Sequence, residues 1–123
     1  MKFAEDHNEA IYKVTSYETE GIKINGRLFQ VPLVLSPTAL IPDWKPTSIS
    51  SLTAEDLEPF YELEAEVILL GTGDKQKFPN TDVLKRLAST QIGFEIMDTQ
   101  AACRTFNIIM AEGRNVVAGL FPK

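Results

Sequence analysis

The chain of 123 residues has 12 Lys and Arg against 17 Asp and Glu, a formal net charge of −5, with 44% hydrophobic and 24% charged residues. This is the composition of one globular domain and not of a disordered tail, and the negative charge argues against a nucleic-acid-binding protein. A single Cys excludes an internal disulfide, and one His with one Cys cannot form a His- or Cys-based zinc site. We therefore expect no metal and no cofactor.

The sequence also bears on location and domain organisation. Its densest apolar stretch, residues 67–70, is far too short to span a bilayer. The acidic start at residues 1–7 is unlike a secretory signal or a transit peptide. We expect a cytoplasmic protein without membrane insertion, a monomer or dimer, in which residues 1–123 form one domain and residues 1–10 are mobile.

The first half of the chain has the alternating, β-branched pattern of short strands, which are predicted at residues 11–15, 22–24, 27–31 and 34–35. Asn25-Gly26 stands between the second and third of these runs. Both residues accept positive φ angles, so the pair favours a tight hairpin. Residues 36–51 contain three prolines and are predicted to be a loop.

The second half alternates strands and helices. After a short helix opened by residues 53–57, strands are predicted at residues 67–70, 94–97 and 116–120. Helices are predicted between them, one from Asn80 to before Gly93 and one from Asp98 to about Ala111. This β-α-β-α-β order favours a layered α/β sheet with parallel strand pairs. The direction of the last strand is left open.

A candidate binding site follows from the two inner strands. If they are parallel, the loops after them open at the same edge of the sheet, where ligands of α/β sheets bind. Small residues that let backbone amides approach a ligand follow the first strand, and a helix N-terminus follows the second. Such an arrangement suits an anion or a carbonyl oxygen. The candidate ligand-binding residues are Gly71, Thr72, Gly73, Asp98, Thr99, Arg104, Thr105 and Asn107.

Structural interpretations of the same residues stay open. Residues 71–73 fit a tight turn, and they match neither a dinucleotide fingerprint nor a P-loop. Asp98 fits an ordinary helix cap. Arg104 fits an ion pair with a nearby carboxylate, and Cys103 fits a buried, inert thiol. Nucleophilic catalysis would have to recruit His7 from near the terminus, so the sequence defines no catalytic set and we lean against an enzyme.

Trp44 lies within the proline-rich loop and has two interpretations. It pins the loop onto the core, or it is an exposed contact for a protein partner, since Trp is enriched at interface hot spots.

Three strings carry a family resemblance: LLGTG at 69–73, DTQAACRTFN at 98–107 and EGRNV at 112–116. With the N-terminal pattern around Tyr17 and Ile24-Asn25-Gly26, they resemble an uncharacterised family that includes the mitochondrial NADH dehydrogenase (complex I) assembly factor 3. The chain looks like a bacterial member. It has Phe106 where Tyr is frequent in the family, so any role of that hydroxyl is lost here.

The resemblance implies a three-layer α/β fold with a central mixed sheet and an added N-terminal hairpin region. It also implies a function without established catalysis, because the mitochondrial relatives act by binding proteins. Our first hypothesis is therefore a non-enzymatic protein-interaction or assembly-type factor with unknown protein partners. The alternative is a protein or enzyme that binds a small anionic ligand at the carboxyl edge of the sheet.

Overall fold

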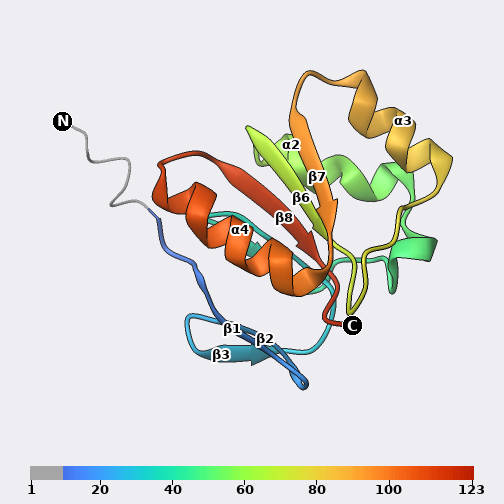
Figure 1. Cartoon of the computed structure of the whole chain (residues 1–123). Helices are drawn as coiled ribbons and strands as arrows, with labels where there is room; N and C mark the ends of the chain where they lie inside the picture. Colours follow the sequence, from blue (N-terminus) through green and yellow to red (C-terminus); the bar gives the residue numbers. More distant parts are fainter. Residues whose placement is uncertain (1–9) are drawn as a thin grey trace.

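A computed structural model describes residues 10–123. Two sheets organise these residues (Figure 1). The smaller is antiparallel and contains β1 (Val14–Glu18), β2 (Gly21–Ile24) and β3 (Arg27–Phe29). The larger has the order β5-β4-β8-β6-β7 and contains β4 (Leu33–Leu35), β5 (Leu40–Ile41), β6 (Val67–Gly71), β7 (Gly93–Met97) and β8 (Val116–Leu120). The predictions for residues 1–10, and His7 with them, lie outside the described residues apart from Ala10.

The larger sheet is mixed. β6 pairs in parallel with both β7 and β8, whereas β4 pairs antiparallel with β8 and β5. The direction that the sequence left open is thus parallel for the last strand relative to β6. The predicted α/β fold class with a central mixed sheet is confirmed.

Helices cover both faces of this sheet. α4 (Thr99–Ala111) lies on one face together with the small sheet, while α2 (Glu58–Glu62) and α3 (Thr81–Ser89) lie on the other. Alternation along β6 explains how one strand serves both layers, because Val67 and Leu69 join the first core cluster and Ile68 and Leu70 the second. This continuous burial is what the apolar run predicted.

Local signals set the boundaries of the elements. Asn25 and Gly26 have φ angles of 52° and 82°, as the hairpin prediction requires. Asn80 and Asp98 cap α3 and α4 by accepting bonds from backbone N–H groups three residues on. The short helix begins as the 3-10 turn η2 (Ala54–Leu57) and continues into α2, where Pro59 is tolerated in the first turn.

Several sequence-based boundaries are wrong, among them the end of the strand predicted at 27–31, which stops at Phe29. The first strand begins at Val14 and not at Ile11, because the N–H groups of Ile11 and Tyr12 bond to the carbonyl of Pro37 instead of to β2. The loop at 36–51 contains β5 and the 3-10 turn η1 (Ile49–Ser51). α3 ends at Ser89, and Gly93 is the first residue of β7.

Candidate functional site

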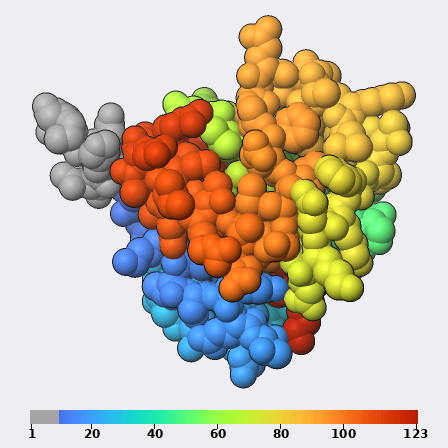
Figure 2. Space-filling model, viewed as in Figure 1, coloured from blue at the N-terminus to red at the C-terminus, as the bar shows by residue number. Residues whose placement is uncertain are grey.

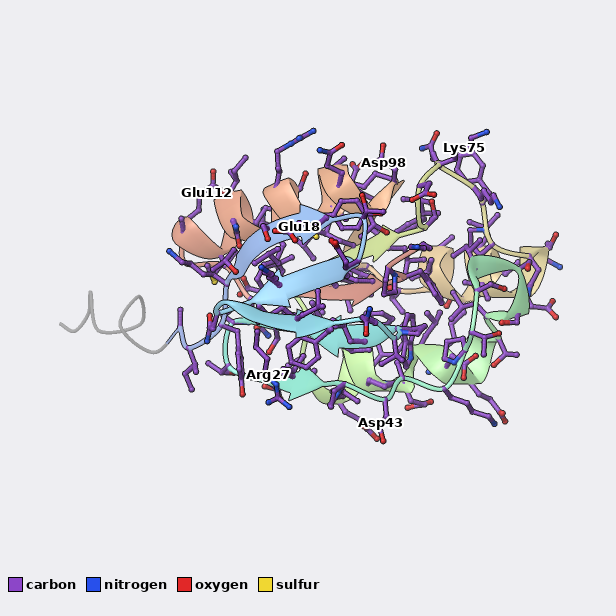
Figure 3. The ribbon with its side chains drawn as sticks, turned by 90° about the horizontal axis from the view of Figure 1, so that it is seen from below. Glu18, Arg27, Asp43, Lys75, Asp98 and Glu112 are labelled. Carbon is purple, nitrogen blue, oxygen red and sulfur yellow. The ribbon has the colours of Figure 1, made fainter. Side chains whose placement is uncertain are left out.

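The two loops of the candidate site meet at one edge of the sheet. Gly71 at the end of β6 is in register with Met97 at the end of β7. Beyond them, the N–H of Thr72 donates to the carbonyl of Met97 at 2.9 Å. Asp98, at the start of α4, lies at the end of this helix nearer to Lys75 of the loop after β6, whereas Glu112 marks the opposite end of α4 (Figure 3).

Thr99 ties three chain segments together at this edge. Its buried hydroxyl accepts from the N–H of Gly73 at 2.8 Å and donates to the carbonyl of Phe121 at 2.6 Å, while its own N–H donates to the carbonyl of Gly73 at 2.9 Å. Gly73 has a φ of +104°, and a Cβ there would come within 2.5 Å of the carbonyl carbon of Lys123. Only glycine fits this crossing.

The polar groups proposed as ligand donors are therefore used within the fold. The N–H groups of Thr72 and Gly73 both have internal acceptors. The Thr72 hydroxyl, also buried, donates to the carbonyl of Lys75 and accepts from the N–H of Lys77 at 3.1 Å. Asp98 accepts from the N–H of Ala101 at 2.8 Å. The turn and cap interpretations describe these contacts fully, and ligand binding stays a prediction.

The remaining candidates on α4 diverge from this edge. Asn107 pairs with the backbone of Val14, accepting from its N–H at 3.0 Å and donating to its carbonyl at 2.7 Å, so it holds β1 against α4. The Thr105 hydroxyl lies 3.5 Å from the sulfur of Met97 in β7. Arg104 is exposed. The structure thus brings residues 71–73, 98 and 99 together but does not bring Arg104, Thr105 and Asn107 to them.

A small hollow lies between β1 and α4. It encloses about 190 Å³ and is lined by Ser16, Tyr17, Gln100, Cys103 and Arg104 among others. Cys103 is only 4% exposed, and burial raises the pKa of its thiol to about 12. It is therefore a protonated, weakly nucleophilic thiol at neutral pH, as the inert interpretation required.

A larger hollow of about 630 Å³ lies beside the edge, lined by Tyr17, Glu18, Glu20, Asp74, Gln100 and Lys123 among others. The Tyr17 hydroxyl donates to the carbonyl of Pro122 at 2.9 Å and lies 3.3 Å from Asp74. Burial, and then the neighbouring carboxylate of Asp74, raise the pKa of Tyr17. Three carboxylates against one lysine make this hollow unfavourable for an anion.

Trp44 belongs mainly to the core. It is 7% exposed, its rings lie 5.2 Å from Phe121 and 5.7 Å from Phe60, and its indole N–H donates to the carbonyl of Asp56 at 3.0 Å. A Cβ at Gly119 would lie 2.6 Å from the Trp44 ring. These contacts pin the proline-rich loop to β8, and a role of Trp44 in protein interaction stays a prediction.

The loop between β6 and α3 contains two residues that the sequence did not single out. Phe78 is 67% exposed. The side-chain amide of Gln76 donates to the carbonyl of Ile96 in β7 at 2.8 Å. Figure 2 shows this loop, in yellow, lying beside the first turns of α4. The available signal was a lone aromatic residue between Lys77 and Pro79, in a segment with no predicted helix or strand.

Comparison with known proteins places these features in a family. Residues 14–121 match a family model described as protein of unknown function (DUF498/DUF598). The chain belongs to this family. The match covers most of the chain, including the edge, α4 and the small sheet, and it confirms the resemblance seen in the sequence.

The relatives within the DUF498/DUF598 family have varied names. The chain is 37% identical over 111 residues to NADH dehydrogenase [ubiquinone] 1 alpha subcomplex assembly factor 3 of Danio rerio, covering 89% of this chain and 63% of that protein. It is 33% identical over 86 residues to a 13 kDa major membrane protein of Francisella tularensis, covering 69% and 70%. The chain thus spans about three-fifths of the length of the assembly factors that it matches.

Solved structures share the fold. A crystal structure of a Bordetella parapertussis protein superposes with a TM-score of 0.84 at 36% identity, over 93% of this chain and 98% of that one. A solution structure of a Bordetella pertussis protein, described as a Mth938-like domain, gives 0.77 at 29% identity, over 99% and 90%. Within residues 10–123 no helix has the length and apolar character needed to cross a bilayer, and no group of three His, Cys, Asp or Glu side chains is arranged to hold a metal ion.

Proposed function

We propose that this protein is a non-enzymatic, protein-binding factor of the assembly type that acts in the cytoplasm. The observation that carries the proposal is the similarity, over 89% of the chain, to proteins named as assembly factors. Those names describe the relatives. For this chain they supply the class of function, binding to other proteins, and not the identity of the complex.

The geometry at the sheet edge supports the same class. A catalytic or anion-binding site at the edge needs donors and charges that are free to meet a ligand. Here the N–H groups of Thr72 and Gly73 and the hydroxyl of Thr99 are engaged with the chain itself. These ligand-binding candidates are thus used in hydrogen bonds that join β6, α4 and the last residues of the chain.

The loop that carries Phe78 supplies a surface for a partner. Apolar side chains scattered singly over a surface are ordinary, but Phe78 combines 67% exposure with a position on a loop joined to the sheet edge through Gln76. Aromatic side chains are favoured contacts at protein interfaces. Because Phe78 contributes little to the core, its replacement separates binding from stability.

Affinity capture from native lysate tests the proposal. The immobilised chain is compared with Phe78→Ser and with the matched control Val31→Ser. Val31 is another exposed apolar side chain, two residues after the end of β3. We expect a specific protein on the wild-type chain, retained by Val31→Ser and reduced about fivefold or more by Phe78→Ser, as for an interface aromatic. The absence of any specific protein on the wild-type chain contradicts the proposal.

A further inference from the structure

Within residues 10–123, the larger sheet has one long edge without a neighbouring strand. In the order β5-β4-β8-β6-β7, the five-residue β7 pairs only with β6, and the opposite edge is the two-residue β5 (Figure 1). An open edge of this length is a template for another strand, and proteins usually blunt or cover such edges. Whether β7 can accept another strand depends on which of its outward N–H and C=O groups already have a hydrogen-bond partner.

Two hydrogen bonds fix the direction of the β7 backbone. The carbonyl of Met97 accepts from Thr72 and so faces β6. Successive carbonyls of a strand point to opposite sides, so the carbonyl of Ile96 faces away from β6, and there it accepts from the side chain of Gln76. By the same alternation, the N–H and C=O of Phe94 and the N–H of Ile96 face the open side. Among residues 10–123, no side-chain or loop hydrogen bond involves these three groups.

As far as the described residues show, the edge is therefore capped at one point and open along the rest. Gln76 satisfies the last outward carbonyl and marks where pairing with another strand must stop. The outward N–H and C=O of Phe94 and the N–H of Ile96 present the donor and acceptor spacing of a normal strand ladder. The side chains of Phe94 and Ile96 point toward the core on the α3 side of the sheet, where both pack against the same hydrophobic cluster. A partner strand can thus bond here without disturbing the core.

Charge identifies the kind of strand that fits. Glu95 is exposed at the centre of β7. If a second copy paired along the full length of β7 in the antiparallel sense, the two Glu95 carboxylates would lie directly opposite one another, which is destabilising. A segment with Lys or Arg opposite Glu95 gains a favourable pair instead, and the net charge of −5 steers basic segments toward the protein.

We propose that β7 receives an extended, basic segment of a partner protein as an additional strand, with a Lys or Arg opposite Glu95. This is strand addition, in which backbone hydrogen bonds supply affinity and side-chain pairs supply specificity. The proposal rests on the protein-binding function argued above and names the surface and the chemistry of the partner. Gln76 borders the end of this edge and lies on the same loop as the exposed Phe78, so we include this loop in the same interface.

A proline substitution tests the backbone requirement. Phe94→Pro removes an N–H that faces outward and leaves the bonds between β7 and β6 intact, as edge strands allow. Phe94→Val is the matched control, because it loses the same ring and keeps the N–H. Melting curves first establish that both variants fold. The probes are two capped peptides, Lys-Thr-Val-Lys-Val-Thr-Lys and Glu-Thr-Val-Glu-Val-Thr-Glu, titrated to about 10 mM, where contacts of a few kcal/mol are detectable.

The readout is the set of backbone amide signals in a ¹⁵N-resolved spectrum. We expect the lysine peptide to shift the Phe94 and Ile96 signals and to bind about fivefold more tightly than the glutamate peptide. Phe94→Val should keep this binding, Phe94→Pro should lose it, and Glu95→Lys should reverse the preference. Unmoved Phe94 and Ile96 signals, equal binding by Phe94→Pro and Phe94→Val, or an unreversed preference each overturn the proposal.

Lysate capture distinguishes this inference from the proposed function. If the wild-type chain and Phe94→Val capture a protein that Phe94→Pro does not, both stand. If Phe94→Pro captures it equally well, the β7 edge is not the docking surface, although the protein-binding function stands. If the wild-type chain captures nothing, the proposed function itself fails.

Discussion

The side-chain hydroxyl of Thr99, at the start of α4, accepts a hydrogen bond of 2.8 Å from the backbone N–H of Gly73, two residues after the end of β6. The two residues are 26 positions apart, and both are buried. From the sequence alone, a threonine at a helix start and a glycine after a strand were candidates for a binding site. In the structure each satisfies the other, so their contact serves the fold.

Replacing Thr99 tests this relationship. Thr99→Val keeps the shape but leaves the N–H of Gly73 and the carbonyl of Phe121 without a side-chain partner, and we expect a loss of about 1–3 kcal/mol in the free energy of unfolding. Thr99→Ser keeps the hydroxyl and should lose clearly less. Urea denaturation measures both, and equal losses for the two variants would contradict the role of the hydroxyl.

Gly119 tests the packing of Trp44. An added Cβ would lie 2.6 Å from the Trp44 ring and 2.8 Å from Phe60, so Gly119→Ala must displace the proline-rich loop or the strand. We expect a loss of about 1–3 kcal/mol from overpacking. Gly93→Ala is the control, since its Cβ meets nothing within 4 Å. Thermal unfolding should separate the two variants, and a neutral Gly119→Ala would show that Trp44 is not held as described.

Asn107 tests the attachment of the small sheet. Asn107→Leu removes both bonds to the Val14 backbone, and we expect a loss of about 1–3 kcal/mol and faster hydrogen exchange at the Val14 amide. Thr105→Val is a suitable control on the same helix, because among residues 10–123 its hydroxyl hydrogen-bonds to the sulfur of Met97 alone. Unchanged exchange at Val14 in Asn107→Leu would show that β1 is held by packing alone.

Cys103 gives the protein a pH dependence on the alkaline side. Burial raises the pKa of its thiol from 9.0 to about 12, so the folded state holds this proton more tightly than the unfolded state does. The stabilisation is complete below pH 9 and is lost as pH rises from 9 toward 12. We expect Cys103→Ala to flatten the fall in stability over this range, measured by urea denaturation at several pH values. A fall of the same steepness in the variant would assign it to other groups.

The same burial controls the reactivity of the thiol. At pH 8 a disulfide reagent should label Cys103 in the native chain much more slowly than in urea, because only the thiolate reacts and the site is closed to solvent. Equal rates in the two conditions would mean that the hollow between β1 and α4 opens freely.

The sequence predicted most of the regular structure because its signals were local. Asn25-Gly26 fixed a hairpin, and Asp98 and Asn80 fixed helix starts, since each acts on its own backbone neighbours. The apolar run of β6 likewise predicted a doubly covered strand and, through it, the shared edge of the sheet. The boundaries at Ile11 and Gly93 were wrong because partners distant in the chain decide them.

The candidate site was less predictable for the same reason. Sequence spacing placed Gly73 and Asp98 at one edge, but it could not show that Thr99 reaches the carbonyl of Phe121 or that Asn107 turns toward Val14. These bonds join segments 22 and 93 positions apart. Nor could it show that Phe78 is left outside the core, since exposure depends on the packing of the whole chain.

Hydrogen exchange at two neighbouring amides of β7 tests most directly whether a partner protein docks on the β7 edge. In the chain alone, the outward N–H of Phe94 should exchange rapidly, and that of Glu95, which faces β6, should be protected. In the complex with the captured partner, the Phe94 amide should slow by about 100-fold, as a newly paired strand requires. A Phe94 amide that stays fast in that complex, or that is already as slow as Glu95 in the chain alone, would contradict docking at this edge.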